Sequence, residues 1–250
     1  MKRMLFFARR NALEILRDPI SLFFGIVFPV ILLLLLTLID RAIPAEAAMN
    51  LYEIKTLAPG ISAFGLCFLA LFSATLISKD RCSSFMLRLR TSPLSPWQYI
   101  AGYCLPMIPM AAVQCTVCAA ASLMLGLKFS GGVFAMILGL MPTACVYIGA
   151  GLLLGSILPE KAVGGICGAL LTNLAGWLSG TWFSVEMIGG AFETICKILP
   201  FYPSACAARA LLQGDWSGAA THLLIVSLWA LAIFAAAVAV FNTKMRSDRA

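Results

Sequence analysis

Few residues in this sequence have the side-chain chemistry that catalysis or metal binding requires. Ser179 and His222 are the single pair that could serve as a nucleophile and its base, which would be the chemistry of an intramembrane hydrolase. Cys115 and Cys118 have the spacing of a metal clamp, but the chain has one histidine and no second such cysteine pair to complete four ligands. We therefore expect no catalytic residue and no metal site, and keep hydrolysis as a less favoured alternative.

These residues lie in long stretches of the chain that carry no charge. An α-helix needs about twenty apolar residues to cross a bilayer, and hydrophobic residues make up 61% of the sequence against 12% charged residues. Such stretches occupy residues 20–39, 57–78, 97–127, 129–159, 162–185 and 216–243. We therefore expect an all-α polytopic membrane protein with six transmembrane helices, in which residues 1–250 form a single transmembrane domain.

The charge-free stretches lack the residues that couple a transporter to an ion gradient. Pumps and ion-coupled transporters place Asp, Glu, Lys or Arg inside the membrane, whereas here those residues lie at span ends or in loops. The chain also has no Gly-rich loop ending in Gly-Lys-Ser or Gly-Lys-Thr that would bind ATP. Any work must then be powered by another polypeptide, and no cofactor is expected in this chain. A gradient-driven carrier or channel without an ATPase is the alternative.

Two uncharged polar residues, Gln114 and Asn173, lie deep in the third and fifth stretches. Either they line a substrate route, or they form hydrogen bonds between helices that are worth roughly 1 kcal/mol or less each. The fifth stretch also carries small residues at intervals of four, at Gly164, Gly168, Thr172, Gly176 and Gly180. Such a stripe lets two helix backbones approach closely, either within the chain or in a subunit interface.

The distribution of basic residues indicates the orientation. Most of the 18 Lys and Arg residues fall near the two chain ends and in the loops before residues 97 and 162. Lys and Arg close to span ends are retained on the cytoplasmic side. We expect both termini in the cytoplasm and a multi-pass protein of the cytoplasmic (inner) membrane. The net charge of +7 then reflects topology and contact with membrane lipids, and no nucleic acid partner is expected.

Residues 1–18 have the pattern of an amphipathic helix. The apolar face holds Met1, Met4, Leu5, Ala8, Ala12, Ile15 and Leu16, and the opposite face holds Arg3, Arg10, Glu14 and Arg17. Such a helix lies flat at the membrane interface with its basic side toward water and headgroups. We expect Arg10, Arg17 and Asp18 to act there, with Pro19 turning the chain into the first span. A solvated basic flank is the alternative.

Residues 79–96 form the largest loop on the expected cytoplasmic side. Asp80 is positioned to cap a short helix with apolar side chains among basic ones. A soluble partner could bind such a helix, through Asp80, Arg81, Phe85, Met86, Arg88, Leu89 and Arg90. A charged connector without a binding role is the alternative.

The expected outer loop, residues 184–215, is too apolar for an ordinary water-exposed loop. Prolines interrupt it before Ser204, which is positioned to cap a helix that stops near Gly214. We expect a re-entrant segment of two short helices, which requires protein or a wet cavity around the broken backbone. A partly buried surface loop is the alternative. Cys196 and Cys206 share this loop and could form a disulfide.

In their order and spacing, these features resemble the permease subunits of type-2 ABC exporters. The resemblance is carried by Arg10, Asn11, Arg17, Asp18, Pro19, Phe28 and Pro29, then by Asp80, Arg81, Arg88, Leu89, Arg90, Ser92, Pro93 and Leu94, and then by Leu199, Pro200, Tyr202, Pro203, Arg209, Gly214 and Asp215. It covers nearly the full chain.

The resemblance implies a six-span half-transporter that pairs with a second permease, either another copy or a paralogue. Two separate ATPase subunits, which bind ATP and Mg²⁺, would dock on its cytoplasmic face. Residues 80–90 would transmit the closure of the ATPases to the spans, and residues 1–18 would brace that helix at the interface. By this resemblance we expect export of an amphipathic or lipid-like compound, such as a drug, a peptide or a lipid-linked cargo.

Overall fold

The computed structural model describes residues 2–43, 53–82 and 96–247, and every regular element within them is helical. In chain order these are α1 (Lys2–Leu16), α2 (Pro19–Leu22), the π-helical turn η1 (Phe23–Val27), α3 (Phe28–Ala42), α4 (Ile54–Gly65), α5 (Phe68–Cys82), α7 (Pro96–Cys104), α8 (Met107–Met124), α9 (Gly131–Gly139), α10 (Met141–Ile157), α11 (Glu160–Val163), the π-helical η3 (Gly164–Leu170), α12 (Leu171–Leu178), α13 (Val185–Ile188), α14 (Gly190–Ile198), α15 (Phe201–Gln213) and α16 (Trp216–Ser247).

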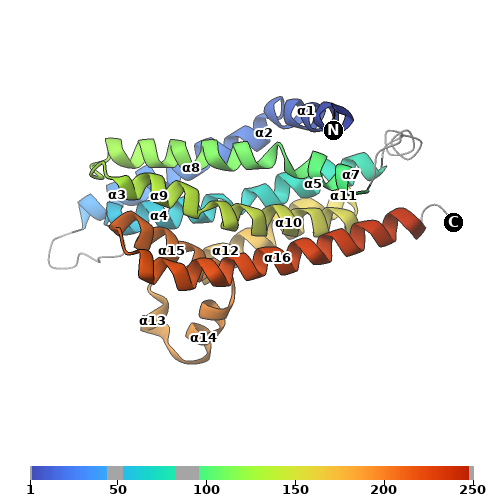
Figure 1. Cartoon of the computed structure of the whole chain (residues 1–250). Helices are drawn as coiled ribbons and strands as arrows, with labels where there is room; N and C mark the ends of the chain where they lie inside the picture. Colours follow the sequence, from blue (N-terminus) through green and yellow to red (C-terminus); the bar gives the residue numbers. More distant parts are fainter. Residues whose placement is uncertain (1, 44–52, 83–95, 248–250) are drawn as a thin grey trace.

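Within the described residues, five helical stretches are long and apolar enough to cross a membrane. They are Pro19–Ala42, Ile54–Arg81, Trp97–Met124, Gly131–Ile157 and Trp216–Phe241, which correspond to the first four and the last of the expected spans. The spans lie side by side as a bundle, with α1 and the end of α16 toward the same end of it (Figure 1). The prediction of an all-α polytopic membrane protein is confirmed.

The fifth expected span, residues 162–185, forms a shorter helix than predicted. Segments α11, η3 and α12 continue one another from Glu160 to Leu178, a rise of about 28 Å, and this stretch is not among the five that meet the length and hydropathy test. The helix ends there because Gly180 adopts a φ of +64°, a left-handed conformation that stops a helix and suits glycine.

The expected outer segment contains three helices rather than two: the short α13, followed by α14 and α15, which meet at an angle of 72°. Together they are apolar and long enough to count as one broken span or a re-entrant loop, and α13 and α14 project from the side of the bundle (Figure 1). The predicted cap at Ser204 is wrong, because α15 already begins at Phe201 and the Ser204 hydroxyl donates to the Pro200 carbonyl at 2.5 Å. The predicted end is confirmed, since Gly214 takes the left-handed conformation with a φ of +80°.

The second span, formed by α4 and α5, is the centre of the bundle. It is buried almost throughout, whereas the first and last spans are mainly exposed. Helix α10 packs closely on α5, and glycines permit this approach. A Cβ at Gly151 would collide with the Ser73 hydroxyl, and one at Gly155 would lie 2.7 Å from the Ala74 carbonyl oxygen. The contact therefore depends on the absence of side chains at these two positions.

The predicted glycine stripe of the fifth helix is only partly covered by protein. A Cβ at Gly164 would meet nothing within 4 Å, and Gly168 has one leucine in ordinary contact. Gly176 and Gly180 are each covered by an aromatic side chain. The end of the stripe with Gly176 and Gly180 thus packs within the chain, while the end with Gly164 and Gly168 leaves surface open.

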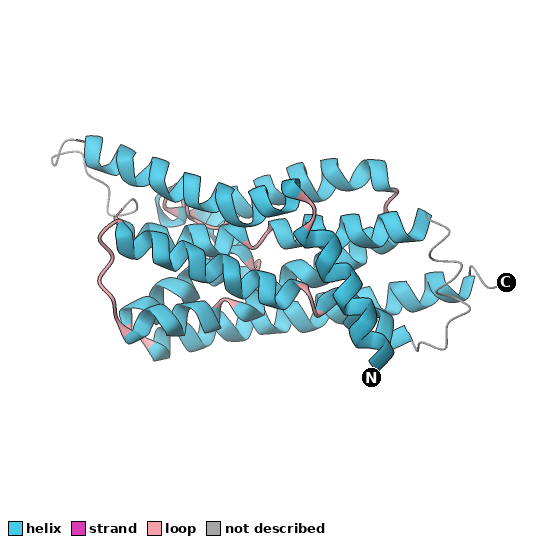
Figure 2. Ribbon diagram, turned by 90° about the horizontal axis from the view of Figure 1, so that it is seen from above, coloured by secondary structure: helices cyan, strands magenta, loops and turns pink. Residues whose placement is uncertain are grey.

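Helix α1 runs at a slant across the bundle, as Figure 2 shows. Its buried positions are Phe7, Ala8, Asn11 and Ile15. The predicted apolar face overlaps this buried face only in part: Ala8 and Ile15 are buried, whereas Leu5 and Leu16 are exposed on the surface and Asn11 is fully buried. A polar residue can occupy the inner face here because its amide finds a partner, as described below.

The close approach of α10 and α5 gives the first prediction. Replacing Gly155 with alanine should lower the free energy of unfolding by about 1–3 kcal/mol, because the added methyl group must displace the α5 backbone. Unfolding in detergent, followed by circular dichroism, measures this. Gly164→Ala is the matched control and should stay within about 0.5 kcal/mol of the parent. Equal losses in the two variants would contradict the packing assigned to Gly155.

Candidate functional site

A buried carboxylate joins three helices at the end of the bundle that carries α1. Asp80 is 2% exposed. Its Oδ2 accepts hydrogen bonds from Arg10 Nη1 at 2.7 Å and from the Tyr103 hydroxyl at 2.9 Å. A buried charge is tolerated only when it is paired and hydrogen-bonded. Asp80 on α5 therefore fixes α1 and the helix α7 in one arrangement.

The same junction is completed by packing between α1 and α7. The Asn11 side chain donates to the Gly102 carbonyl at 3.0 Å and accepts from Arg10 at 2.9 Å. Phe7 lies edge-on to Tyr103 with ring centroids 4.9 Å apart, and a Cβ at Gly102 would collide with its ring. The buried amide of Asn11 is thus satisfied by the Gly102 carbonyl. Helix α1 can lie this close to α7 because residue 102 has no side chain.

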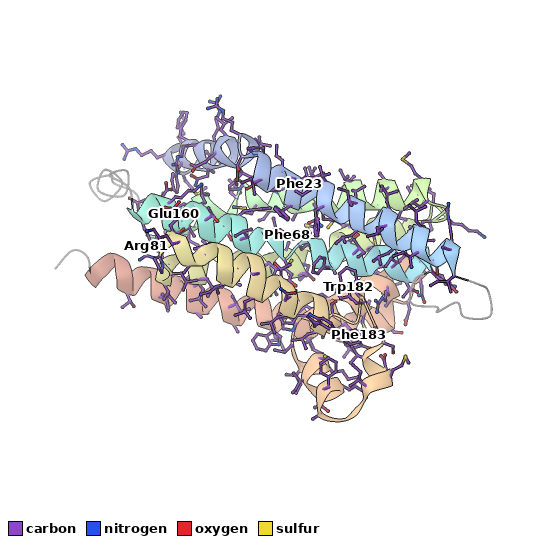
Figure 3. The ribbon with its side chains drawn as sticks, turned by 180° about the vertical axis from the view of Figure 1, so that it is seen from behind. Phe23, Phe68, Arg81, Glu160, Trp182 and Phe183 are labelled. Carbon is purple, nitrogen blue, oxygen red and sulfur yellow. The ribbon has the colours of Figure 1, made fainter. Side chains whose placement is uncertain are left out.

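The neighbouring residue, Arg81, anchors α5 to another helix. Its Nη1 donates to the Gly155 carbonyl at 2.9 Å and to the Leu158 carbonyl at 3.4 Å. These oxygens belong to the C-terminal turn of α10, where free carbonyls and the helix dipole favour a cation. Figure 3 shows Arg81 at the same end of the bundle as Glu160, at the start of α11.

The two described residues of the predicted ATPase-coupling set therefore turn into the bundle. The prediction that Asp80 caps a new helix is wrong, because α5 continues through it to Cys82. The remaining residues of the set, Phe85, Met86, Arg88, Leu89 and Arg90, lie outside the described residues. Asp80 and Arg81 hold the end of α5 from which that segment continues.

The turn between α1 and the first span is set by Asp18 and Pro19. The Asp18 carboxylate accepts from the Ile20 N–H at 3.2 Å and from the Ser21 hydroxyl at 2.6 Å. Pro19 occupies the first helical position, where its missing N–H costs nothing. Arg17 lies exposed beside this turn.

A groove of about 490 Å³ runs between the first span and α12. It is lined by Phe24, Phe28, Phe64, Phe68, Gly168, Thr172, Asn173, Gly176, Trp177 and Trp182. Figure 3 shows Phe68 and Trp182, two of the residues that line this groove. The Asn173 side chain is exposed, and its amide N–H donates to the Ala169 carbonyl of its own helix at 2.9 Å. An exposed amide among aromatic rings can bind a ligand that is mainly apolar and carries a polar group.

The second candidate for the substrate route, Gln114, lies elsewhere. It is 2% exposed and donates to the Ser62 carbonyl at 3.3 Å. Its amide fills the space above Gly65, where a Cβ would collide with it. The structure therefore does not bring Gln114 and Asn173 together, and Gln114 acts as a link between α8 and α4.

Sequence reasoning named Arg209 as part of the family resemblance but missed its structural role. Arg209 on α15 donates through Nε to the Thr56 carbonyl at 3.2 Å and through Nη2 to the Gly180 carbonyl at 2.9 Å. It thereby joins α15 to the start of α4 and to the end of the fifth helix. A cation within an otherwise apolar helix, α15, was the available indication of this structural role.

The projecting helix α13 is attached to α15 by a carboxylate. Glu186 accepts hydrogen bonds from the Ser184 hydroxyl at 2.6 Å and from the Tyr202 hydroxyl. These hydrogen bonds lower the pKa of the Glu186 carboxyl below its usual value. Cys196 and Cys206 lie in the same apolar cluster as Tyr202, and both are free thiols in this structure.

The structure does not assemble the hydrolase alternative. The Ser179 hydroxyl donates to the Gly176 carbonyl at 3.0 Å and bonds to the Thr181 hydroxyl at 2.8 Å. His222 Nδ1 is buried without a hydrogen-bond partner among the described residues. The residues at positions 179 and 222 are thus not joined as a nucleophile and its base. Within residues 2–43, 53–82 and 96–247, no group of three His, Cys, Asp or Glu side chains could hold a metal ion.

The fold and these sites define a multi-pass helical membrane protein with an anchored junction at one end and an aromatic groove along its side. A family model described as ABC-2 type transporter matches residues 3–212. Because this match covers most of the chain, the protein belongs to the ABC-2 type transporter family. A comparison with individual curated proteins gives no match.

This membership identifies the chain as the permease, the membrane component of an ABC-2 transporter, which is not itself catalytic. It also implies association with ABC ATPase subunits. The resemblance inferred from the motifs is confirmed. The match ends within α15, and α16 follows it.

The junction around Asp80 gives the second prediction. Asp80→Asn should lower the free energy of unfolding by about 1–3 kcal/mol, because it leaves Arg10 without its buried partner. Unfolding in detergent measures the loss, and trypsin cleavage within α1 should become faster. Glu14→Gln is the control: it removes a surface pair with Arg10 at 2.8 Å, which should cost only about 0.3–0.5 kcal/mol. If the two variants unfold alike, Asp80 is not the anchor.

Proposed function

We propose that this chain is the permease of an ATP-driven exporter that moves an amphipathic or lipid-like compound across the cytoplasmic membrane. A separate ABC ATPase supplies the energy. The observation that carries the proposal is the family match over residues 3–212. The anchored end of α5 supports it, since Asp80 and Arg81 fix the helix from which the predicted coupling segment continues.

The groove beside α12 supports the choice of cargo. It presents aromatic rings together with one exposed amide, and no charged residue lines it. A soluble ion or sugar would lose hydration there without gaining charge or dense hydrogen bonding. A compound with a large apolar part and a few polar groups fits this lining better.

The groove also supports pairing with a second permease, either another copy or a paralogue. It is open along one side of a single chain, and the exposed Trp177 and Asn173 lie on it. A second chain facing it would enclose a route between two such grooves. The orientation we propose places both termini in the cytoplasm, because the basic residues gather at that end of the bundle.

Reconstitution tests this proposal and gives the third prediction. The chain is purified with the ATPase that accompanies it and placed in vesicles with a fluorescent amphiphile. We expect uphill movement of the amphiphile only when both the ATPase and ATP are present. Movement catalysed by the chain alone would contradict the proposal and favour the gradient-driven carrier or channel.

A pair of tryptophan variants in the same assay tests the groove. Trp177 lines the groove and is 60% exposed, while Trp216 is 66% exposed at the start of α16. Trp177→Ala should lower the transport rate about tenfold, because a large aromatic contact with the cargo or the second chain is lost. Trp216→Ala should leave the rate unchanged. Equal transport rates in the two variants would show that the groove is not part of the transport route.

A further inference from the structure

A second cavity lies at the end of the bundle that carries α1, away from the aromatic groove. Its volume is about 570 Å³. The lining residues are Arg10, Leu13, Glu14, Arg17, Asp18, Pro19 and Lys79. One wall is α1 with its following turn, and the opposite wall is the last part of α5.

Both acidic residues of this cavity are already bound to donors of the protein. Glu14 pairs with Arg10 at 2.8 Å, and Asp18 accepts from the Ile20 N–H and the Ser21 hydroxyl. Glu14 is thus paired with Arg10, whereas Asp18 accepts from neutral donors and keeps its charge beside the cavity. The three cations of the lining still outnumber its two carboxylates.

The two other cations of the cavity are Arg17 and Lys79, which are exposed on opposite walls. Neither has a hydrogen-bond or ion-pair partner among the residues that the structure describes. A guanidinium and an ammonium that face one cavity suit an anion with several oxygens, because the guanidinium binds two oxygens at once and the ammonium a third. A phosphate group has this chemistry.

The surface beside the cavity is apolar. Leu13 belongs to the wall and is exposed, and Leu16, Ile20 and Phe23 follow it on the exposed side of α1 and the first span. A free phosphate ion would leave this surface uncovered. A molecule with a phosphate head and hydrocarbon chains would use the cations and the apolar surface together.

We propose that this cavity binds the headgroup of an anionic phospholipid, with its phosphate between Arg17 and Lys79 and its acyl chains along the exposed side of α1 and the first span. With both termini in the cytoplasm, the lipid belongs to the cytoplasmic leaflet, which holds the anionic lipids. The bound lipid braces α1 against α5 next to the Asp80 junction. This site requires neither ATP nor an ATPase, so its failure would leave the proposed function standing.

Native mass spectrometry of the full chain in detergent tests the site. The probes are phosphatidylglycerol and phosphatidylcholine with identical acyl chains. The parent protein should retain phosphatidylglycerol in preference to phosphatidylcholine. The double variant Arg17→Gln, Lys79→Gln should bind phosphatidylglycerol about tenfold or more weakly, because two cations near the headgroup are lost.

The matched control is Arg3→Gln, Arg9→Gln, which removes the same charge from exposed positions of α1 outside the cavity. It should retain the parent's preference, and circular dichroism should show both double variants folded. Equal weakening in the two would mean that general surface charge attracts the lipid, and the site would be refuted. Unchanged binding in Arg17→Gln, Lys79→Gln would also refute it and leave these cations to a protein partner. Displacement of the lipid by inorganic phosphate would identify a free-anion site instead.

Discussion

The absence of water in the bilayer core is the constraint on which this structure depends, because a polar group left without a partner there is costly. The hydroxyls of Ser73 and Ser156 satisfy it locally by donating to carbonyls one turn earlier in their own helices. The ionised side chains find their partners on other helices, and so they join separate helices. Asp80 connects α5 to α1 and α7, and Arg209 connects α15 to two other helices. The polar residues therefore mark the junctions of the bundle.

Much of the fold could be predicted from the sequence, because a run of about twenty uncharged residues has few alternatives to a membrane-spanning helix. The five long spans follow from this rule. The helical outer segment was predicted instead from its apolar composition and from the stop signal at Gly214. The length of the fifth helix could not be predicted, since it depends on the backbone conformation at Gly180. The inner face of α1 was predicted only in part, because periodicity ranks Asn11 as polar. Its burial depends on a carbonyl supplied by Gly102, 91 residues along the chain.

The sequence could predict which residues form the candidate sites, but not what each residue does there. Asp80 and Arg81 were identified by their place in a recognisable motif, yet a motif does not say whether a charge faces a partner or its own bundle. Arg81 faces α10 because the carbonyls at the end of that helix lie within reach. Gln114 and Asn173 have equivalent chemistry, and the packing of neighbouring helices places one in the interior and the other on the groove. Such distinctions depend on contacts between distant parts of the chain.

We propose that the anchored end of α5 passes the movement of the ATPase to the spans. The most direct measurement compares ATP hydrolysis with transport in the assembled complex, for the parent and for Asp80→Asn in the folded state. A loosened junction should still allow the ATPase to hydrolyse ATP, but less of its movement should reach the spans. The number of molecules transported per ATP should therefore fall severalfold while hydrolysis continues. An unchanged ratio of transport to hydrolysis would contradict the claim.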